Sequence, residues 1–156
     1  MSDTPKDSTG ATPLEELSPD ECRTLLSLAA VGRVAFVVEG TPVVLPVNYR
    51  VLNDEAGVPI LMRTRPGNII DNAPRQVAFE IDGINHEDQT GWSVLVQGTL
   101  HHLDHNDVEL VIHRFDPKPW VHDERSSWLA IKPTVITGRK LPDPEIGWVF
   151  SDRAYL

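Results

Sequence analysis

The sequence contains a single cysteine, Cys22, among its 156 residues. One thiol excludes an internal disulfide framework and is typical of a reducing compartment. No apolar run reaches the length of a membrane span, and the first sixteen residues contain no hydrophobic segment of a secretory signal. We therefore expect a cytoplasmic protein that does not associate with membranes.

Basic residues are also scarce, with 14 Lys and Arg against 23 Asp and Glu and a net charge of −9. Neutralising nucleic-acid phosphates requires a basic face, so nucleic acid is not an expected partner. An anionic cofactor would need a local basic pocket that works against the overall field. The candidates for such a pocket are Arg33, Arg63, Arg65 and Arg139.

Familiar catalytic patterns are missing as well. We identify no serine-histidine-acid arrangement, no paired-carboxylate signature and no phosphate-binding Walker loop. His101, His102 and His105 do not complete a tetrahedral metal site, because neighbours on a strand point to opposite faces. Cys22 falls on the apolar face of a predicted helix and is expected in the core. We therefore predict no metal and no catalytic side chain.

The length predicts one domain. Residues 1–16 are polar and are expected to form a disordered tail, residues 17–141 the domain, and residues 142–156 a C-terminal tail. Ser18, Pro19 and Glu21 have the pattern of a helix start with a capping box. Gly32 is expected to stop this helix.

The rest of the pattern is mainly β. A second helix is predicted from Asn106 to about Phe115, with Glu109 at its third position. Residues 83–90 are expected to form a polar loop, and Pro133 is compatible with a strand only at an edge or a bulge. The predicted strands are 34–38, 43–52, one ending near Thr64, 77–82, 92–103 and 128–141. Six strands joined mostly by turns favour a small antiparallel β-barrel with peripheral helices over a doubly wound sheet.

The segment from Leu45 to Asp82 contains the clearest candidate site. Arg63 and Thr64 end a strand immediately before the Pro66-Gly67 break and a short helix-like piece. An arginine, the amides of a glycine turn and a helix start together make a plausible phosphate seat. The local pattern alone favours a solvated strand end followed by an ordinary turn, and only the order of the surrounding motifs reverses that preference.

Two further motifs, Gly91-Trp92-Ser93-Val94 and Ile136-Thr137-Gly138-Arg139, follow in order. With them, the chain from Leu17 to Leu141 resembles the pyridoxamine 5′-phosphate oxidase-like flavin-binding proteins. It is most similar to their short branch, which includes nitroimidazole-resistance proteins. The resemblance implies a six-stranded antiparallel split β-barrel of the FMN-binding type. It also implies a homodimer with each cofactor site between two subunits, and the C-terminal tail is expected to pack on that dimer.

The resemblance implies a set of cofactor-binding residues. The arginine, threonine and glycine would hold the FMN phosphate, and the preceding strand would run beside the flavin ring. The Trp-Ser pair, a loop tryptophan and the last arginine would complete the site. These residues are Val47, Asn48, Tyr49, Arg63, Thr64, Gly67, Asn68, Trp92, Ser93, Trp120 and Arg139. Asn68 stands where relatives tend to have a lysine. From patterning alone, Tyr49 could instead be a half-buried sheet residue, Trp92 a core side chain and Trp120 a loop anchor.

The expected function is that of an FMN-dependent oxidoreductase, because in this family the flavin carries the redox chemistry and the protein orients it. Its substrate would be a small molecule, such as a nitroaromatic or quinone-like compound, with a nicotinamide donor. True pyridoxamine phosphate oxidase activity is not expected, since no pyridoxal-phosphate-binding C-terminal motif is recognisable. The alternatives are a deazaflavin-dependent reductase and a non-catalytic protein that binds flavin or haem.

Overall fold

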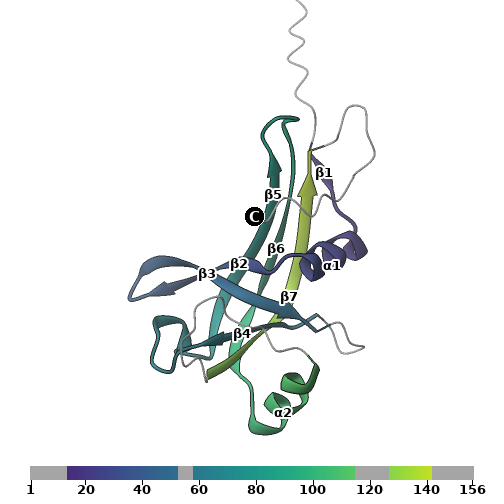
Figure 1. The fold of residues 1–156 in the computed structure, drawn as a ribbon. Helices are drawn as coiled ribbons and strands as arrows, with labels where there is room; N and C mark the ends of the chain where they lie inside the picture. The colour runs from purple at the N-terminus through teal and green to yellow at the C-terminus, as the bar shows by residue number, and fades with distance from the viewer. Residues whose placement is uncertain (1–13, 53–57, 115–126, 142–156) are drawn as a thin grey trace, which may run out of the picture.

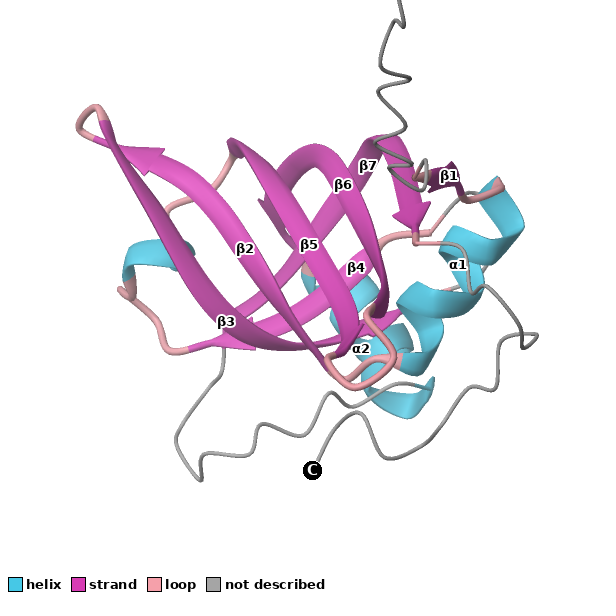
Figure 2. Cartoon of the chain, turned by 90° about the horizontal axis from the view of Figure 1, so that it is seen from above, coloured by secondary structure: helices cyan, strands magenta, loops and turns pink. Residues whose placement is uncertain are grey.

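Six long antiparallel strands close into a barrel in the computed structural model, which describes residues 14–52, 58–114 and 127–141. They are β2 (Val31–Val38), β3 (Thr41–Val51), β4 (Ile60–Thr64), β5 (Arg75–Asn85), β6 (Thr90–His102) and β7 (Ser127–Lys140). The strand order β7-β4-β3-β2-β5-β6 closes because β6 also pairs with β7. Figure 1 shows β5, β6 and β7 rising together while β2, β3 and β4 cross them, and Figure 2 shows the strands wrapping around the interior. The predicted mainly β, six-stranded antiparallel barrel is confirmed.

The barrel is split along one edge of β7. On that edge β4 pairs with β7 from Ser127 to Ile131, and the short β1 (Glu15–Glu16) pairs with Arg139 and Lys140. Between these two pairings, helix α1 (Pro19–Leu28) packs against β7, and the Leu17 amide donates to the Gly138 carbonyl oxygen at 2.9 Å. Glu15 and Glu16, which we expected in the disordered tail, thus form a seventh short strand, because the edge of β7 offers them hydrogen-bond partners.

Helix α1 begins as the sequence predicts. Ser18 caps it, its hydroxyl accepts from the Glu21 amide at 3.2 Å, and the Ser18 amide donates to the Glu21 carboxylate at 2.7 Å. The predicted stop at Gly32 is wrong, because the helix ends at Leu28 and Gly32 lies inside β2. A Cβ atom at position 32 would come within 2.2 Å of the Phe79 ring. Gly32 therefore leaves room for an aromatic side chain rather than ending a helix.

Two hairpins shape the remainder of the sheet. Glu39 and Gly40 both have positive φ, at 48° and 80°, as a two-residue turn between twisted strands requires. The predicted loop over residues 83–90 is shorter in the structure, since β5 continues to Asn85 and β6 starts at Thr90, which leaves a turn over residues 86–89. Cross-strand pairing of Gly83 with Trp92 extends the ladder through residues whose polarity suggested a loop.

Pro133 lies at an irregularity of the sheet, and the second predicted helix is present. The β6–β7 register shifts between Gln97 and Gly98, and Pro133 pairs at that irregularity, as predicted. Helix α2 (His105–Arg114) begins one residue earlier than expected. Its cap is Asp104 rather than Asn106, because the Asp104 carboxylate accepts from the Asp107 amide at 2.8 Å.

The core fills the barrel, with a smaller cluster outside it. The inward-facing side chains of the barrel strands pack together inside it, among them Val34, Tyr49, Phe79, Val96 and Leu129. A second cluster lies between β4, β7 and α2 and contains Leu61, Val111, Trp128 and Ala130. β4 is consequently buried on both faces, which holds its last residues, Arg63 and Thr64, in a fixed position. Among the described helices, none is long and apolar enough to cross a membrane.

Candidate functional site

The predicted site residues form two groups at opposite ends of β7. Arg63 pairs with Trp128 and Thr64 with Ser127 at the start of β7, whereas Ser93 pairs with Arg139 near its end. Eleven residues of extended chain separate Trp128 from Arg139, which corresponds to roughly 35 Å along the strand. That separation exceeds the length of a flavin mononucleotide, so one chain does not bring both groups to one such molecule.

Arg63 and Thr64 differ in what they can offer a ligand. The Arg63 guanidinium carbon lies 5.0 Å from the centre of the Trp128 ring, within the range of a cation–π interaction. This contact orients the arginine at the end of the sheet. The Thr64 residue is only 3% exposed, so its hydroxyl is buried beneath the strand end. Of this pair, the arginine is the residue able to reach an anion from solvent.

The backbone amides of the turn after β4 donate hydrogen bonds to acceptors within the turn itself. Gly67 has a φ of 76°, and its amide donates to the Asp71 carboxylate at 2.8 Å. The Asn68 amide donates to the Arg65 carbonyl oxygen at 3.1 Å, and the Asp71 amide to the Asn68 carbonyl oxygen at 2.8 Å. The helix-like piece is the 3₁₀ helix η1 (Ile69–Asp71), which is too short to present a helix dipole. The side chain of Asn68 makes no capping hydrogen bond.

Asp71 is the residue that the sequence analysis missed. Besides the Gly67 amide, its carboxylate accepts hydrogen bonds from the Ser127 hydroxyl and from His102 Nε2, the latter at 3.0 Å. Ser127 is the cross-strand partner of Thr64, so the carboxylate lies beside the predicted phosphate seat. Partial burial alone would raise the pKa of Asp71, but the hydrogen bonds from Ser127, Gly67 and His102 outweigh it and lower that pKa. The carboxylate is therefore charged at neutral pH.

The backbone of the turn thus fits an anion, and the anion it holds is the chain's own carboxylate. A phosphate bound to the Gly67 amide would have to displace Asp71 and would face a second negative charge. The amides of this turn therefore do not fit a phosphate group, and Arg63 is the part of the predicted seat that does. The sequence signal for this contact is an acidic residue four positions after the turn glycine, but the sequence alone does not show that its side chain folds back onto the turn.

The residues predicted beside the flavin ring lie on β3. Tyr49 is fully buried, its hydroxyl donates to the Leu26 carbonyl oxygen at 2.8 Å, and its ring meets Phe79 edge-on at 4.9 Å. The Tyr49 side chain therefore belongs to the core. Val47 and Asn48 are half-buried. Asn48 and Arg63 flank the paired residues Tyr49 and Met62, so they lie on neighbouring strands at the same end of the ladder.

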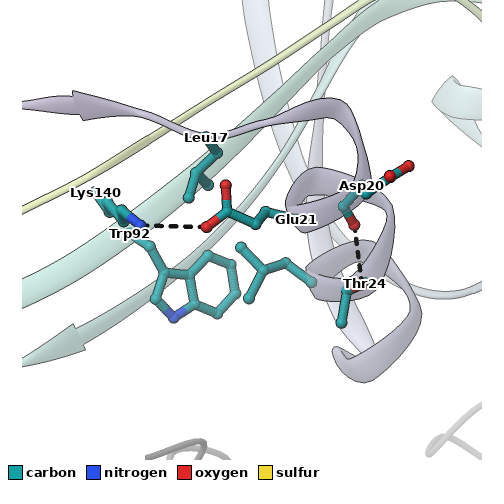
Figure 3. A pocket seen from close by; sticks show the side chains of 7 residues that line it. Leu17, Asp20, Glu21, Thr24, Trp92 and Lys140 are labelled. Atoms are coloured by element: carbon teal, nitrogen blue, oxygen red, sulfur yellow. Dashed lines mark hydrogen bonds and ion pairs between the residues drawn. The ribbon is translucent and has the colours of Figure 1, made fainter. Parts of the chain in front are cut away.

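Trp92 lines a pocket of about 370 Å³ between β6 and α1 (Figure 3). Leu17 and Leu25 add apolar walls, and Lys140 donates to the Glu21 carboxylate at 3.2 Å across one side. Hydrogen bonds from the backbone and hydroxyl of Ser18, and then the one from Lys140, lower the pKa of Glu21. Trp92 thus faces a pocket with mostly apolar walls, closed on one side by an ion pair.

Ser93 and Arg139 lie beside Trp92 at the end of β7 but do not line its pocket. Ser93 pairs with Asp82 on one side and Arg139 on the other, and Arg139 is exposed. Arg33 binds Asp82 and Glu80, each at 2.9 Å, and these carboxylates raise its pKa. Trp120 lies outside the described residues.

The sequence predicts that His101, His102 and His105 do not form a metal site. In the structure His102 pairs with Asp71, and His105 lies 3.5 Å from Glu109. Within the described ranges, no group of three or more histidine, cysteine, aspartate or glutamate side chains is placed to hold a metal ion.

Asp71 should make stability depend on pH in a defined direction. Its folded-state pKa lies below the unfolded value, so its contribution is present above about pH 4 and is lost as the pH falls through the folded pKa. In a His102→Gln background, which leaves Asp71 as the ionisable member of this hydrogen-bonded cluster, Asp71→Asn should lower the free energy of unfolding by about 1–3 kcal/mol at pH 7. Urea unfolding at pH 7 and below pH 4 should show this difference shrink in acid. A difference that is the same at both pH values would contradict the role of the charged carboxylate.

Comparison with known proteins shows to which family the chain belongs. The model of the family described as pyridoxamine 5′-phosphate oxidase matches residues 18–140. An uncharacterized protein of Mycobacterium tuberculosis is 32% identical over 135 residues, covering 81% of this chain and 84% of its own length. A structure described as the FAD binding protein of Mycobacterium smegmatis matches with a TM-score of 0.61 and 30% identity, over 83% of this chain and all of that one. A candidate pyridoxamine 5′-phosphate oxidase from Corynebacterium glutamicum matches with a TM-score of 0.66 and 27% identity, over 84% of this chain and 95% of its own. The chain therefore belongs to the pyridoxamine 5′-phosphate oxidase family, as the order of its motifs predicts.

Proposed function

We propose that this protein binds a flavin nucleotide and works as a flavin-dependent oxidoreductase on a small molecule. The observation that carries the proposal is the match to the Mycobacterium smegmatis protein described as FAD binding, which is 30% identical and is covered over its whole length. A bound flavin would supply the redox chemistry, while the protein would position the flavin and its substrate. FMN is the cofactor predicted from the sequence, and the relative's description adds FAD as the second candidate.

The arrangement of charge supports a nucleotide anchored by Arg63. In a chain with a net charge of −9, this arginine is held at the end of the sheet by the Trp128 ring. Asn48, on the neighbouring strand, adds a polar side chain at the same place. A guanidinium can grip a phosphate through two parallel hydrogen bonds, and this geometry gives both affinity and orientation.

Two copies of the chain would bring the separated groups together. The Arg63 group and the Trp92 group lie at opposite ends of β7, so a flavin that touches both must lie between subunits. Leu95 on β6 and Val135 on β7 leave 39% and 46% of their surface exposed; Leu95 lies two residues after Ser93 and Val135 four residues before Arg139. Apolar side chains of this kind on adjacent strands suit a subunit interface. The proposed active form is a homodimer.

The alternatives differ in the cofactor or in its use. A deazaflavin-dependent reductase would use the same fold with another redox ring. A non-catalytic protein that binds flavin or haem would hold its ligand without turnover. Ligand titration distinguishes the first alternative from the proposed function, and reduction of the bound flavin distinguishes the second.

Arg63→Ala should weaken binding of flavin nucleotides at least tenfold. Hydrogen bonds to a charged group contribute about 1.5–3 kcal/mol, and the variant removes the cation of the proposed seat. Arg23→Ala is the matched control, because Arg23 is exposed on α1 and pairs with Asp20. Quenching of flavin fluorescence would give the dissociation constants of both variants. Equal affinities for wild type and Arg63→Ala would remove this residue from the site, and tighter binding of a deazaflavin would favour that alternative.

NADH or NADPH should bleach the absorption of the bound flavin, and an added acceptor should restore it. A nitroaromatic compound and a quinone are the first acceptors to try. Free flavin at the same concentration is the control for reduction in solution. A tightly bound flavin that stays oxidised with both donors would support the non-catalytic alternative instead.

The mass in solution should be twice the chain mass of 17.4 kDa. Light scattering coupled to gel filtration measures it directly. Leu95→Lys should lower this mass, because a charge would be buried in the proposed interface, whereas Val37→Lys is a control on the exposed part of β2. A monomer that binds one flavin per chain would contradict the shared site.

A further inference from the structure

The pocket between α1 and β6 has an aromatic wall that the fold holds in place. A Cβ atom at position 83 would come within 2.7 Å of the Trp92 indole, so Gly83 lets this ring lie close to the backbone of β5. Trp92 pairs with Lys140 on β7, and both side chains line the pocket (Figure 3). Leu17 and Leu25 supply further apolar surface. The volume of about 370 Å³ is in the range of pockets that hold small molecules.

This pocket lies on the opposite face of β6 from the proposed subunit interface. Neighbouring residues of a strand point to opposite faces, so the side chains of Trp92 and Ser93 face different ways. Ser93 pairs with Arg139, and Leu95 follows on the same face. A flavin held between subunits beside Ser93 and Arg139 would therefore leave the pocket open to a different ligand.

The ion pairs around the pocket leave a negative surplus. Lys140 lies 3.2 Å from Glu21 and 3.7 Å from Glu15, and Arg23 lies 3.0 Å from Asp20. Three carboxylates thus face two cations in these pairs. An anionic ligand would be repelled by this surplus, whereas a cationic one would be attracted.

The capping box fixes one of these carboxylates beside the indole. The Ser18 amide donates to the Glu21 carboxylate at 2.7 Å, and the Glu21 amide donates to the Ser18 hydroxyl at 3.2 Å. Hydrogen bonds from Ser18 and then from Lys140 lower the pKa of Glu21, so its carboxylate is charged at neutral pH. A fixed carboxylate next to the ring of Trp92 favours a ligand that is both apolar and positively charged.

We propose that this pocket binds a small cationic aromatic molecule, in which a ring carries a short alkyl amine. The ring packs against Trp92 and Leu25, and the ammonium group meets the Glu21 carboxylate at the rim. The ring contributes apolar contact with the indole, and the ammonium group adds attraction to the carboxylate. The site is independent of the proposed flavin binding.

Titration of the full chain, without flavin, with three probes of matched shape tests this site. The probes are 2-phenylethylamine, 2-phenylethanol and 3-phenylpropanoate, which share a ring and a two-carbon linker but differ in charge. The amine should bind about three- to tenfold more tightly than the alcohol, and the carboxylate should bind most weakly. Calorimetry or saturation-transfer NMR gives the dissociation constants. Equal affinities for the three probes, or no binding of the amine, would overturn the proposal.

Thr24→Trp should abolish binding of the amine, because the new indole would fill the pocket from the exposed surface of α1. Ser27→Trp is the matched control. Ser27 is exposed on the same helix, its hydroxyl also donates to the carbonyl oxygen four residues earlier, and it is not among the residues that line the pocket. The same loss of binding in both variants would contradict the assignment.

Glu21→Gln should reduce the preference for the amine over the alcohol to less than about twofold, since glutamine lacks the charge but can complete the capping box. Glu109→Gln removes the same charge from α2 and should leave the preference unchanged. Circular dichroism checks that both variants fold, and Asp20→Asn removes a charge at the same rim if Glu21→Gln does not. A preference that survives in the rim variant would overturn the role of the carboxylate.

Riboflavin separates this proposal from the proposed function. Riboflavin that displaces the amine competitively would assign the pocket to the flavin ring and overturn the amine site. Flavin binding that leaves the affinity for the amine unchanged would support two separate sites. A chain that binds the amine but no flavin would overturn the proposed function and leave the amine site intact.

Discussion

The pairing of β7 is the constraint on which the rest of the structure depends. This strand joins β6 along most of its length, β4 at its start and β1 near its end. It thereby closes the barrel and leaves the gap that α1 covers. The same pairing sets Trp128 under Arg63, Ser127 within reach of Asp71 and Arg139 beside Ser93. The Arg63 group and the Trp92 group of the candidate site both take their position from this strand.

Charged side chains dominate the surroundings of the candidate site. The chain is strongly acidic, and Arg33, one of its candidate cations, is already held by Glu80 and Asp82. Arg63 is oriented by an aromatic ring, and its neighbouring turn contains a partly buried carboxylate. A ligand bound here would meet the Arg63 guanidinium and the Asp71 carboxylate within a few residues of each other.

Local signals predicted local structure well. The capping box at Ser18 depends on residues three positions apart, and Pro133 lacks an amide, so both consequences follow from nearby atoms. Gly32 and residues 83–85 were predicted incorrectly for one common reason. Their conformation is set by partners far along the chain, the Phe79 ring for Gly32 and the Trp92 strand for Gly83. A glycine that makes room for a distant ring has the same sequence pattern as one that ends a helix.

The sequence by itself determined the fold class, the family and the presence of an arginine at the end of a strand before a glycine turn. Periodicity and the order of motifs are sufficient for these, because they depend on neighbours along the chain. Only the tertiary structure decided that Tyr49 is a core residue, that Trp92 faces a pocket on α1, and that Asp71 fills the turn. Each of these depends on contacts between strands distant in sequence, and the physical reason is the closure of the barrel through β7, which places Ser127 and His102 around a carboxylate from another strand's turn.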